Sequence, residues 1–121
     1  RRSRITLPDG SRVWLNADSK LEFPKQFSGS LREVRLVGEA FFDVTHNPRQ
    51  PFVIRLETAS IRVLGTSFNV RAYPGEAAVH TTVVTGRVAF IPNPKNQSGG
   101  RADTLFVTPN RHVVQQVQTL A

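Results

Sequence analysis

The sequence predicts an all-β fold, most simply a two-sheet antiparallel sandwich of jelly-roll type. Two observations predict it: apolar and polar residues alternate along most of the 121 residues, and apolar segments recur around turn residues at intervals of 21 to 28 residues. Alternation with a period of two places successive side chains on opposite faces of a strand. No stretch of ten or more residues shows convincing helical periodicity. A short β-solenoid is the alternative, although solenoid repeats usually keep a tighter period.

The strand segments share one plan, with a turn residue at the centre of each. Gly10, Gly38, Gly65 and Gly86 occupy this position in the first four segments, and Asn110 occupies it in a weaker fifth. Glycine reaches positive φ without steric cost, and Asn is its commonest substitute there. We therefore expect a hairpin or tight bend at each centre, with positive φ at Gly65 and Gly86. The segments are 5–15, 34–44, 61–70, 82–90 and 105–114.

Two regions depart from this plan. Residues 19–30 contain Pro24, Gly29 and the spaced apolar residues Leu21, Phe23 and Phe27, which indicates a strand followed by a covering loop. Residues 92–103 contain almost no apolar side chain and are rich in Pro, Gly and Asn, so they are expected to form an exposed loop. At this length the whole chain, 1–121, is expected to form one domain.

The composition excludes several classes of protein. The chain has no cysteine, which rules out disulfides and thiolate chemistry. Its formal net charge of +7 comes from 16 Lys and Arg against 9 Asp and Glu. Nucleic-acid binders usually cluster their positive charge, whereas these arginines are spread one or two to a segment, which favours a solvated outer face. The arginines concerned are Arg32, Arg35, Arg55, Arg62, Arg71, Arg87 and Arg111.

Catalytic and metal-binding patterns are also lacking. His46, His80 and His112 are 34 and 32 residues apart, without the paired spacing that metal sites show. Glu39 and Asp43 share a strand face, but no nucleophile or row of aromatic side chains accompanies them. We therefore expect no enzyme activity, no catalytic residue, no metal ion and no cofactor.

Short motifs along the chain resemble, in their order, those of the FecR family. They begin with the Asp9-Gly10 turn and continue through the Gly-Glu-Ala-Phe-Phe block that starts at Gly38. The resemblance covers roughly residues 5–114, although Asn110 replaces the glycine of the family's closing turn. The expected structural motif residues are Asp9, Gly10, Gly38, Glu39, Ala40, Pro51, Phe52, Gly65, Thr66, Phe68, Asn69 and Gly86.

The resemblance implies a function in signal transduction. FecR-like proteins are inner-membrane anti-sigma regulators that work with TonB-dependent outer-membrane transporters. This chain would be their periplasmic β domain, without the cytoplasmic anti-sigma segment, the membrane anchor or the C-terminal α/β module. It would relay the state of a transporter to an extracytoplasmic-function sigma factor, which switches on genes for iron-siderophore or glycan uptake. The expected partners are proteins: the transporter's signalling domain, the C-terminal module and, through the cytoplasmic segment, the sigma factor. The partner-binding residues are not identified.

Two other functions remain as alternatives. A non-catalytic carbohydrate-binding sandwich is suggested by Trp14, whose ring could stack on a sugar, although a core or interface role is more frequent for a single Trp. A nucleic-acid binder is suggested only by the net charge of +7.

Overall fold

The computed structural model describes residues 2–93 and 104–109, and the backbone of 112–116. The described residues form eleven strands and no helix, which confirms the all-β prediction. No segment among them is a helix capable of crossing a bilayer. The strands are β1 (Ser3–Thr6), β2 (Arg12–Leu15), β3 (Lys20–Glu22), β4 (Arg32–Asp43), β5 (Phe52–Arg55), β6 (Ala59–Val63), β7 (Ser67–Ala72), β8 (Ala78–Thr85), β9 (Val88–Pro92), β10 (Leu105–Val107) and β11 (His112–Gln116).

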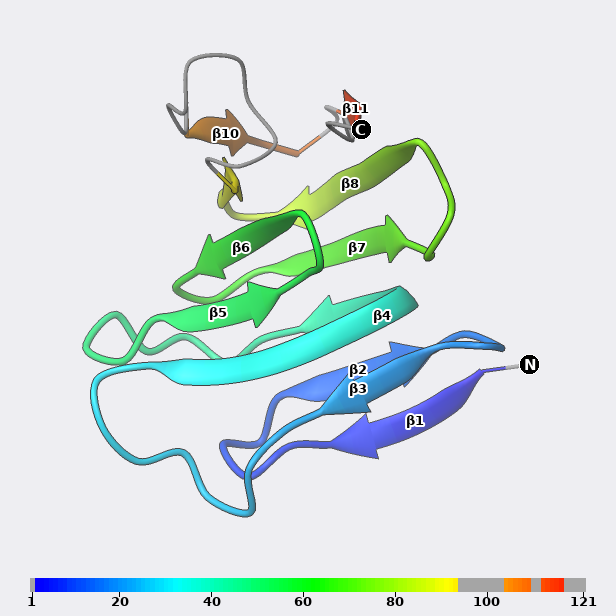
Figure 1. The fold of residues 1–121 in the computed structure, drawn as a ribbon. Coiled ribbons are helices and arrows are strands. Elements are labelled where there is room, and N and C mark those ends of the chain that lie inside the picture. The colour runs from blue at the N-terminus through cyan, green and yellow to red at the C-terminus, as the bar shows by residue number, and fades with distance from the viewer. Residues whose placement is uncertain (1, 94–103, 110–111, 117–121) are drawn as a thin grey trace.

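The strands are arranged in two layers that share one long strand. Sheet A has the order β1-β2-β4-β7-β8-β11, and sheet B has the order β3-β4-β5-β6-β9-β10. Figure 1 shows β4 running along one layer, turning, and returning along the other. This two-layer arrangement is consistent with the predicted sandwich. One pair, β4 with β5, is parallel, and the other pairs among the described strands are antiparallel.

The change of layer within β4 occurs at Gly38. Residues 32–37 of the strand pair with β3 and β5 in sheet B, and residues 38–43 pair with β2 and β7 in sheet A. Gly38 has φ +105°, and a Cβ on it would lie 2.8 Å from the backbone Cα of Ser19. Both observations require glycine here, so the predicted tight bend is a transfer between sheets.

The core lies between the two layers, where the buried faces of the strands meet. Along β4 every second residue is buried, beginning with Arg32, Val34 and Leu36. Phe42 of sheet A stacks on Phe68 of the same sheet at 5.3 Å between ring centroids. The ring of Phe42 also meets Phe52 of sheet B edge-on at 6.2 Å. These contacts join the layers into a single apolar core.

The loop between β3 and β4 covers one end of this core, as the sequence predicted. Phe27 packs edge-on against the ring of Phe52, with 6.0 Å between the centroids. Gln50 donates hydrogen bonds from its side-chain amide to the carbonyl oxygens of Phe27 and Gly29, at 3.4 Å and 3.3 Å. The loop is therefore attached to the segment that precedes β5.

Two details of the predicted turns are wrong. Gly65 does not have a positive φ: it is required because a Cβ would lie 2.5 Å from the Cα of His46. Pro92, placed in the predicted exposed loop, is buried at the end of β9, opposite Ala59 of β6. The rest of that loop, 94–103, and the turn at Asn110 lie outside the described residues. Gly10 and Gly86 have the expected positive φ, +88° and +76°.

Candidate functional site

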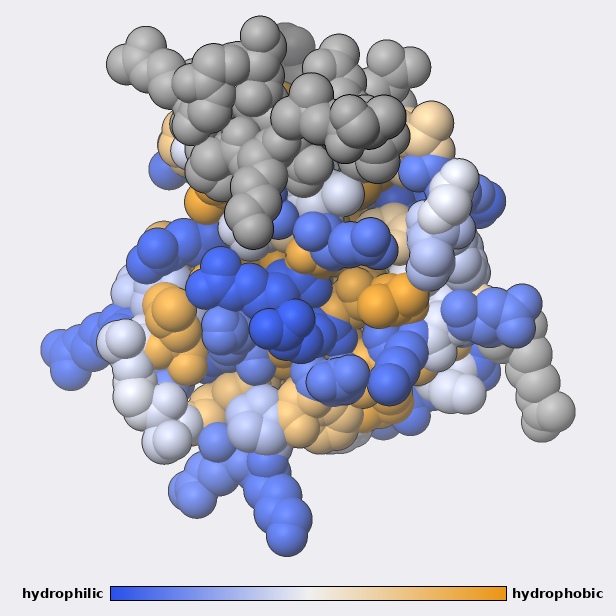
Figure 2. Space-filling model, in the orientation of Figure 1, coloured by the Kyte–Doolittle hydropathy of each residue, from blue (hydrophilic) through white to orange (hydrophobic). Residues whose placement is uncertain are grey.

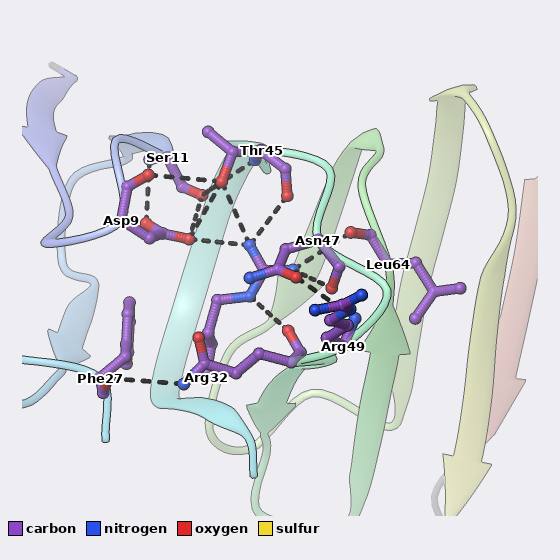
Figure 3. Close-up of polar contacts among 9 residues, drawn as sticks. Asp9, Ser11, Phe27, Arg32, Thr45, Asn47, Arg49 and Leu64 are labelled. Carbon is purple, nitrogen blue, oxygen red and sulfur yellow. Dashed lines mark hydrogen bonds and ion pairs between the residues drawn. The ribbon is translucent and has the colours of Figure 1, made fainter. Parts of the chain in front are cut away.

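A buried cluster around Arg32 holds four chain segments together at one end of the sandwich. The Arg32 side chain is 0 % exposed. Its Nη1 donates to Asp9 Oδ2 at 2.9 Å and to the carbonyl oxygen of Thr45 at 2.8 Å. Its Nε donates to the carbonyl oxygen of Gln50 at 2.6 Å, and its Nη2 donates to that of Leu64 at 3.1 Å. Figure 3 shows the guanidinium surrounded by these acceptors.

The even spread of arginines along the sequence predicts a solvated side chain for Arg32, and this prediction is wrong. The residue shares the buried parity of Val34 and Leu36 on β4, and that pattern could have identified it. A buried guanidinium is tolerated only where its donors find acceptors. Here one carboxylate and several backbone carbonyls supply them, and the Cζ atom of Arg32 lies 5.4 Å from the centroid of the Phe52 ring.

Asp9, the predicted turn residue, is the carboxylate partner in this cluster. Its side chain is 13 % exposed, and it accepts hydrogen bonds from the backbone N–H and the hydroxyl of Ser11 at 3.0 Å and 2.8 Å. Burial alone would raise the pKa of Asp9. The hydrogen bonds from Ser11 and Arg32, together with the positive charge of Arg32, outweigh burial and place the pKa of Asp9 below its ordinary value.

A second group of polar residues lies on the outer face of sheet A, around Glu39. Glu39 Oε1 accepts a hydrogen bond from the amide of Asn16 at 2.6 Å, and Oε2 accepts one from the amide of Asn69 at 3.0 Å. Arg71 lies 3.9 Å from the same carboxylate. Strands β4 and β7 and Asn16, the residue after β2, are thereby connected through one side chain.

Asp43 on this face is also engaged by its neighbours. It pairs with Arg12 at 2.6 Å and accepts a hydrogen bond from the hydroxyl of Ser67 at 3.0 Å. No group of three His, Asp or Glu side chains that could hold a metal ion occurs in the described part of the chain. Glu39 and Asp43 each contact side chains from the neighbouring strands of sheet A.

Trp14 has an aromatic neighbour that the sequence analysis missed. Phe41 lies opposite it on β4, with 5.7 Å between the ring centroids in an edge-to-face arrangement. The guanidinium of Arg12 lies 5.6 Å from the centroid of the Trp14 ring. The half-buried Trp14 ring thus contacts Phe41 and Arg12 on the surface of sheet A.

The remaining motif residues lie in the core or at the changes of layer. Phe52 and Phe68 are 0 % exposed, and Ala40 is 1 % exposed. The carbonyl oxygen of Pro51 accepts the backbone N–H of Arg32 at 2.8 Å. Thr66 is buried beside Gly86, and its carbonyl oxygen accepts the N–H of Val44 at 2.9 Å.

Comparisons with family models and with solved structures point to the same class of protein. A family model described as FecR protein matches residues 1–89. Two crystal structures of a candidate anti-sigma factor from Parabacteroides distasonis ATCC 8503 share 34% sequence identity with this chain, at TM-scores of 0.85 and 0.86. Each alignment covers 96% of this chain and 51% of the other, so this chain spans about half the length of those proteins. The search of curated proteins found no match.

Proposed function

The chain belongs to the FecR family, and from this premise we propose that it is the periplasmic signal-sensing domain of an anti-sigma factor anchored in the inner membrane. The family match and the structural neighbours support a domain of a sigma-factor regulator. The family is regulatory rather than catalytic. The sequence resemblance to the FecR family is confirmed.

In the proposed mechanism the domain relays the state of a TonB-dependent transporter to an extracytoplasmic-function sigma factor. The observation that carries this proposal is the FecR match over 1–89, together with the similarity to a candidate anti-sigma factor. The carboxylates of Asp9, Glu39 and Asp43 are engaged in contacts that hold strands and turns together, so these residues support the fold and do not mark a partner surface. Partners would then be recognised by exposed faces and strand edges, as is common for sheet proteins.

The proposal is tested by titrating the complete periplasmic region with the signalling domain of the cognate transporter. We expect saturable one-to-one binding by calorimetry, and loss of sigma-dependent reporter expression in cells when the β domain is deleted. A fusion of the full-length protein to a reporter enzyme that is active only in the periplasm tests the location. Absence of binding together with an unaffected reporter would contradict the proposal.

The same protein tests the carbohydrate-binding alternative. Because the Trp14 ring packs against Phe41 and Arg12, we expect no saturable binding on a glycan array. Saturable binding that is abolished by Trp14→Ala would favour that alternative instead.

A further inference from the structure

The outer face of sheet B contains a hollow whose centre is a small side chain. Ala89 of β9 lies directly between Arg62 of β6 and Phe106 of β10 in the strand register. A methyl group between two long side chains leaves an open volume of about 330 Å³. Leu64, which follows β6, and Arg87, which precedes β9, also line the hollow, together with His46 and Gly65.

The rim of the hollow combines exposed apolar surface with two arginines. Leu64 is 43 % exposed and Phe106 is 61 % exposed. The guanidinium of Arg87 lies 4.9 Å from the centroid of the Phe106 ring, which holds the charge beside the hollow. Within the described ranges no carboxylate lines the hollow, and neither Arg62 nor Arg87 is within ion-pair distance of one.

Most of the acidic side chains are occupied elsewhere. Six carboxylates of the described residues already have a cationic partner: Asp9, Glu22, Glu33, Glu39, Asp43 and Glu76. Figure 2 shows strongly hydrophilic side chains across the middle of the face formed by β5 and β6, with hydrophobic ones on both sides. The charges of Arg62 and Arg87, which have no ion pair among the described residues, are therefore available to an acidic partner.

The wall of the hollow is fixed by the buried cluster. The carbonyl oxygen of Leu64 accepts hydrogen bonds from Arg32 Nη2 at 3.1 Å and from the N–H of Asn47 at 2.9 Å. The backbone of Gly65 packs against that of His46, at a distance that leaves no room for a Cβ. Because these contacts order the wall before any partner arrives, little conformational entropy is lost when one binds.

We propose that this hollow binds an extended acidic segment of a protein partner. An apolar side chain of that segment lies over Ala89, and carboxylates on either side of it pair with Arg62 and Arg87. A purely apolar segment would desolvate the two guanidiniums without pairing them. A nucleic-acid backbone would leave Leu64 and Phe106 without an apolar contact. This inference rests on the proposed function in one respect, because it takes the partner to be a protein.

The test uses two six-residue peptides that differ only in charge. The acidic probe is acetyl-Asp-Glu-Leu-Phe-Asp-Glu-amide, and the neutral probe replaces each acid with its amide. We expect the acidic probe to shift the NMR signals of Ala89 and Phe106 and to bind about tenfold more tightly than the neutral probe. Higher salt should weaken this binding.

Three variants test whether the acidic probe binds at the hollow. The double variant Arg62→Gln, Arg87→Gln removes both charges, and Ala89→Leu fills the hollow while keeping them. Each is expected to weaken binding of the acidic probe about tenfold. The matched control is Arg35→Gln, which removes an exposed arginine of β4 that has no ion pair among the described residues and should change affinity less than about twofold. Thermal melts establish that each variant is folded.

Four outcomes would overturn the proposal. These are equal binding of the two probes, full affinity in Ala89→Leu, a loss in Arg35→Gln as large as in the double variant, or tighter binding of a short DNA duplex with the same dependence on Arg62 and Arg87. A fifth result would overturn it as well: if the acidic probe binds the isolated domain but not the full-length protein, the hollow is occupied by another part of the same chain and not by a separate partner. Probe binding without transporter binding would instead contradict the proposed function and leave the hollow as assigned.

Discussion

The guanidinium of Arg32 is completely buried at a place where four chain segments converge. Its acceptors come from the β1–β2 turn, from the segment between β4 and β5, and from the end of β6. Each of these segments would otherwise present unpaired carbonyl groups to the interior, at a cost in free energy. One long cationic side chain therefore replaces several separate contacts, and it also fixes the wall of the hollow at Leu64.

Replacing Arg32 with Met should destabilise the domain strongly. The substitution keeps much of the side-chain volume but leaves Asp9 and the surrounding carbonyls without their donor. Breaking a buried pair in this way costs about 3–5 kcal/mol, measured as the free energy of unfolding in urea. The exposed arginine Arg35 provides the control, because Arg35→Met should change that free energy by less than about 0.5 kcal/mol. A small effect at Arg32 would mean that the cluster contributes little to stability.

The contribution of Asp9 should depend on pH in a defined direction. Because the pKa of Asp9 in the folded state lies below its ordinary value of 3.8, its stabilisation is fully present above that value. It is lost as pH falls through the folded pKa. The difference in unfolding free energy between wild type and Asp9→Asn should therefore be constant above about pH 5 and decrease below pH 3.8. A difference that grows on acidification would contradict the assignment.

At the scale of elements, glycines make the changes of layer possible. The chain passes between sheets at Gly38, in the link from β6 to β7 at Gly65, and in the link from β8 to β9 at Gly86. The reason differs among them: Gly38 and Gly86 have positive φ, whereas Gly65 is limited by the approach of the His46 backbone. The sequence pattern predicted that these positions turn and that Gly86 has positive φ, but the positive φ that it predicted at Gly65 is wrong.

Replacing Gly65 with Ala tests whether glycine is required there by the close approach of the His46 backbone and not by positive φ. A methyl group there meets backbone atoms of His46, which cannot rotate away, so we expect a loss of about 2–3 kcal/mol in unfolding free energy. Gly75→Ala is the matched control, since Gly75 has φ +82° but no atom within 4 Å of the added Cβ. Its cost should be about 1 kcal/mol, from backbone strain alone. Equal losses at the two sites would indicate that close packing at His46 is unimportant.

At the scale of the whole molecule, the shared strand β4 joins the two sheets. Residues 32–37 pair in sheet B and residues 38–43 pair in sheet A, and the contact of Phe42 with Phe52 connects the layers through the core. Neither sheet buries its apolar face without the other. We therefore regard the two layers as a single cooperative unit.

Unfolding should accordingly occur in one transition. Trp14 is the only Trp, so its fluorescence reports on sheet A, whereas far-ultraviolet circular dichroism reports on the strands of both sheets. We expect the two signals to give the same urea midpoint and the same slope. Fluorescence that changes at a lower urea concentration would show that sheet A opens independently.

Much of the fold could be predicted because strand geometry is local. The period of two in 34–44 follows from the pleat of a strand, and the observed burial along β4 has that period. The positive φ at Gly10 and Gly86 follows likewise from the absence of a side chain. For the candidate site the sequence supplied Asp9 and Glu39 as motif residues, but not Arg32, Phe41 or the residues of the hollow.

The sequence alone therefore determined the fold class, the buried face of each main strand and the family to which the chain belongs. Only the tertiary structure decided which acceptors surround Arg32, that β4 serves both sheets, and that Arg62, Ala89 and Phe106 form one row. These outcomes depend on pairing between strands that are far apart along the chain, and a local pattern of polarity does not specify which strand pairs with which.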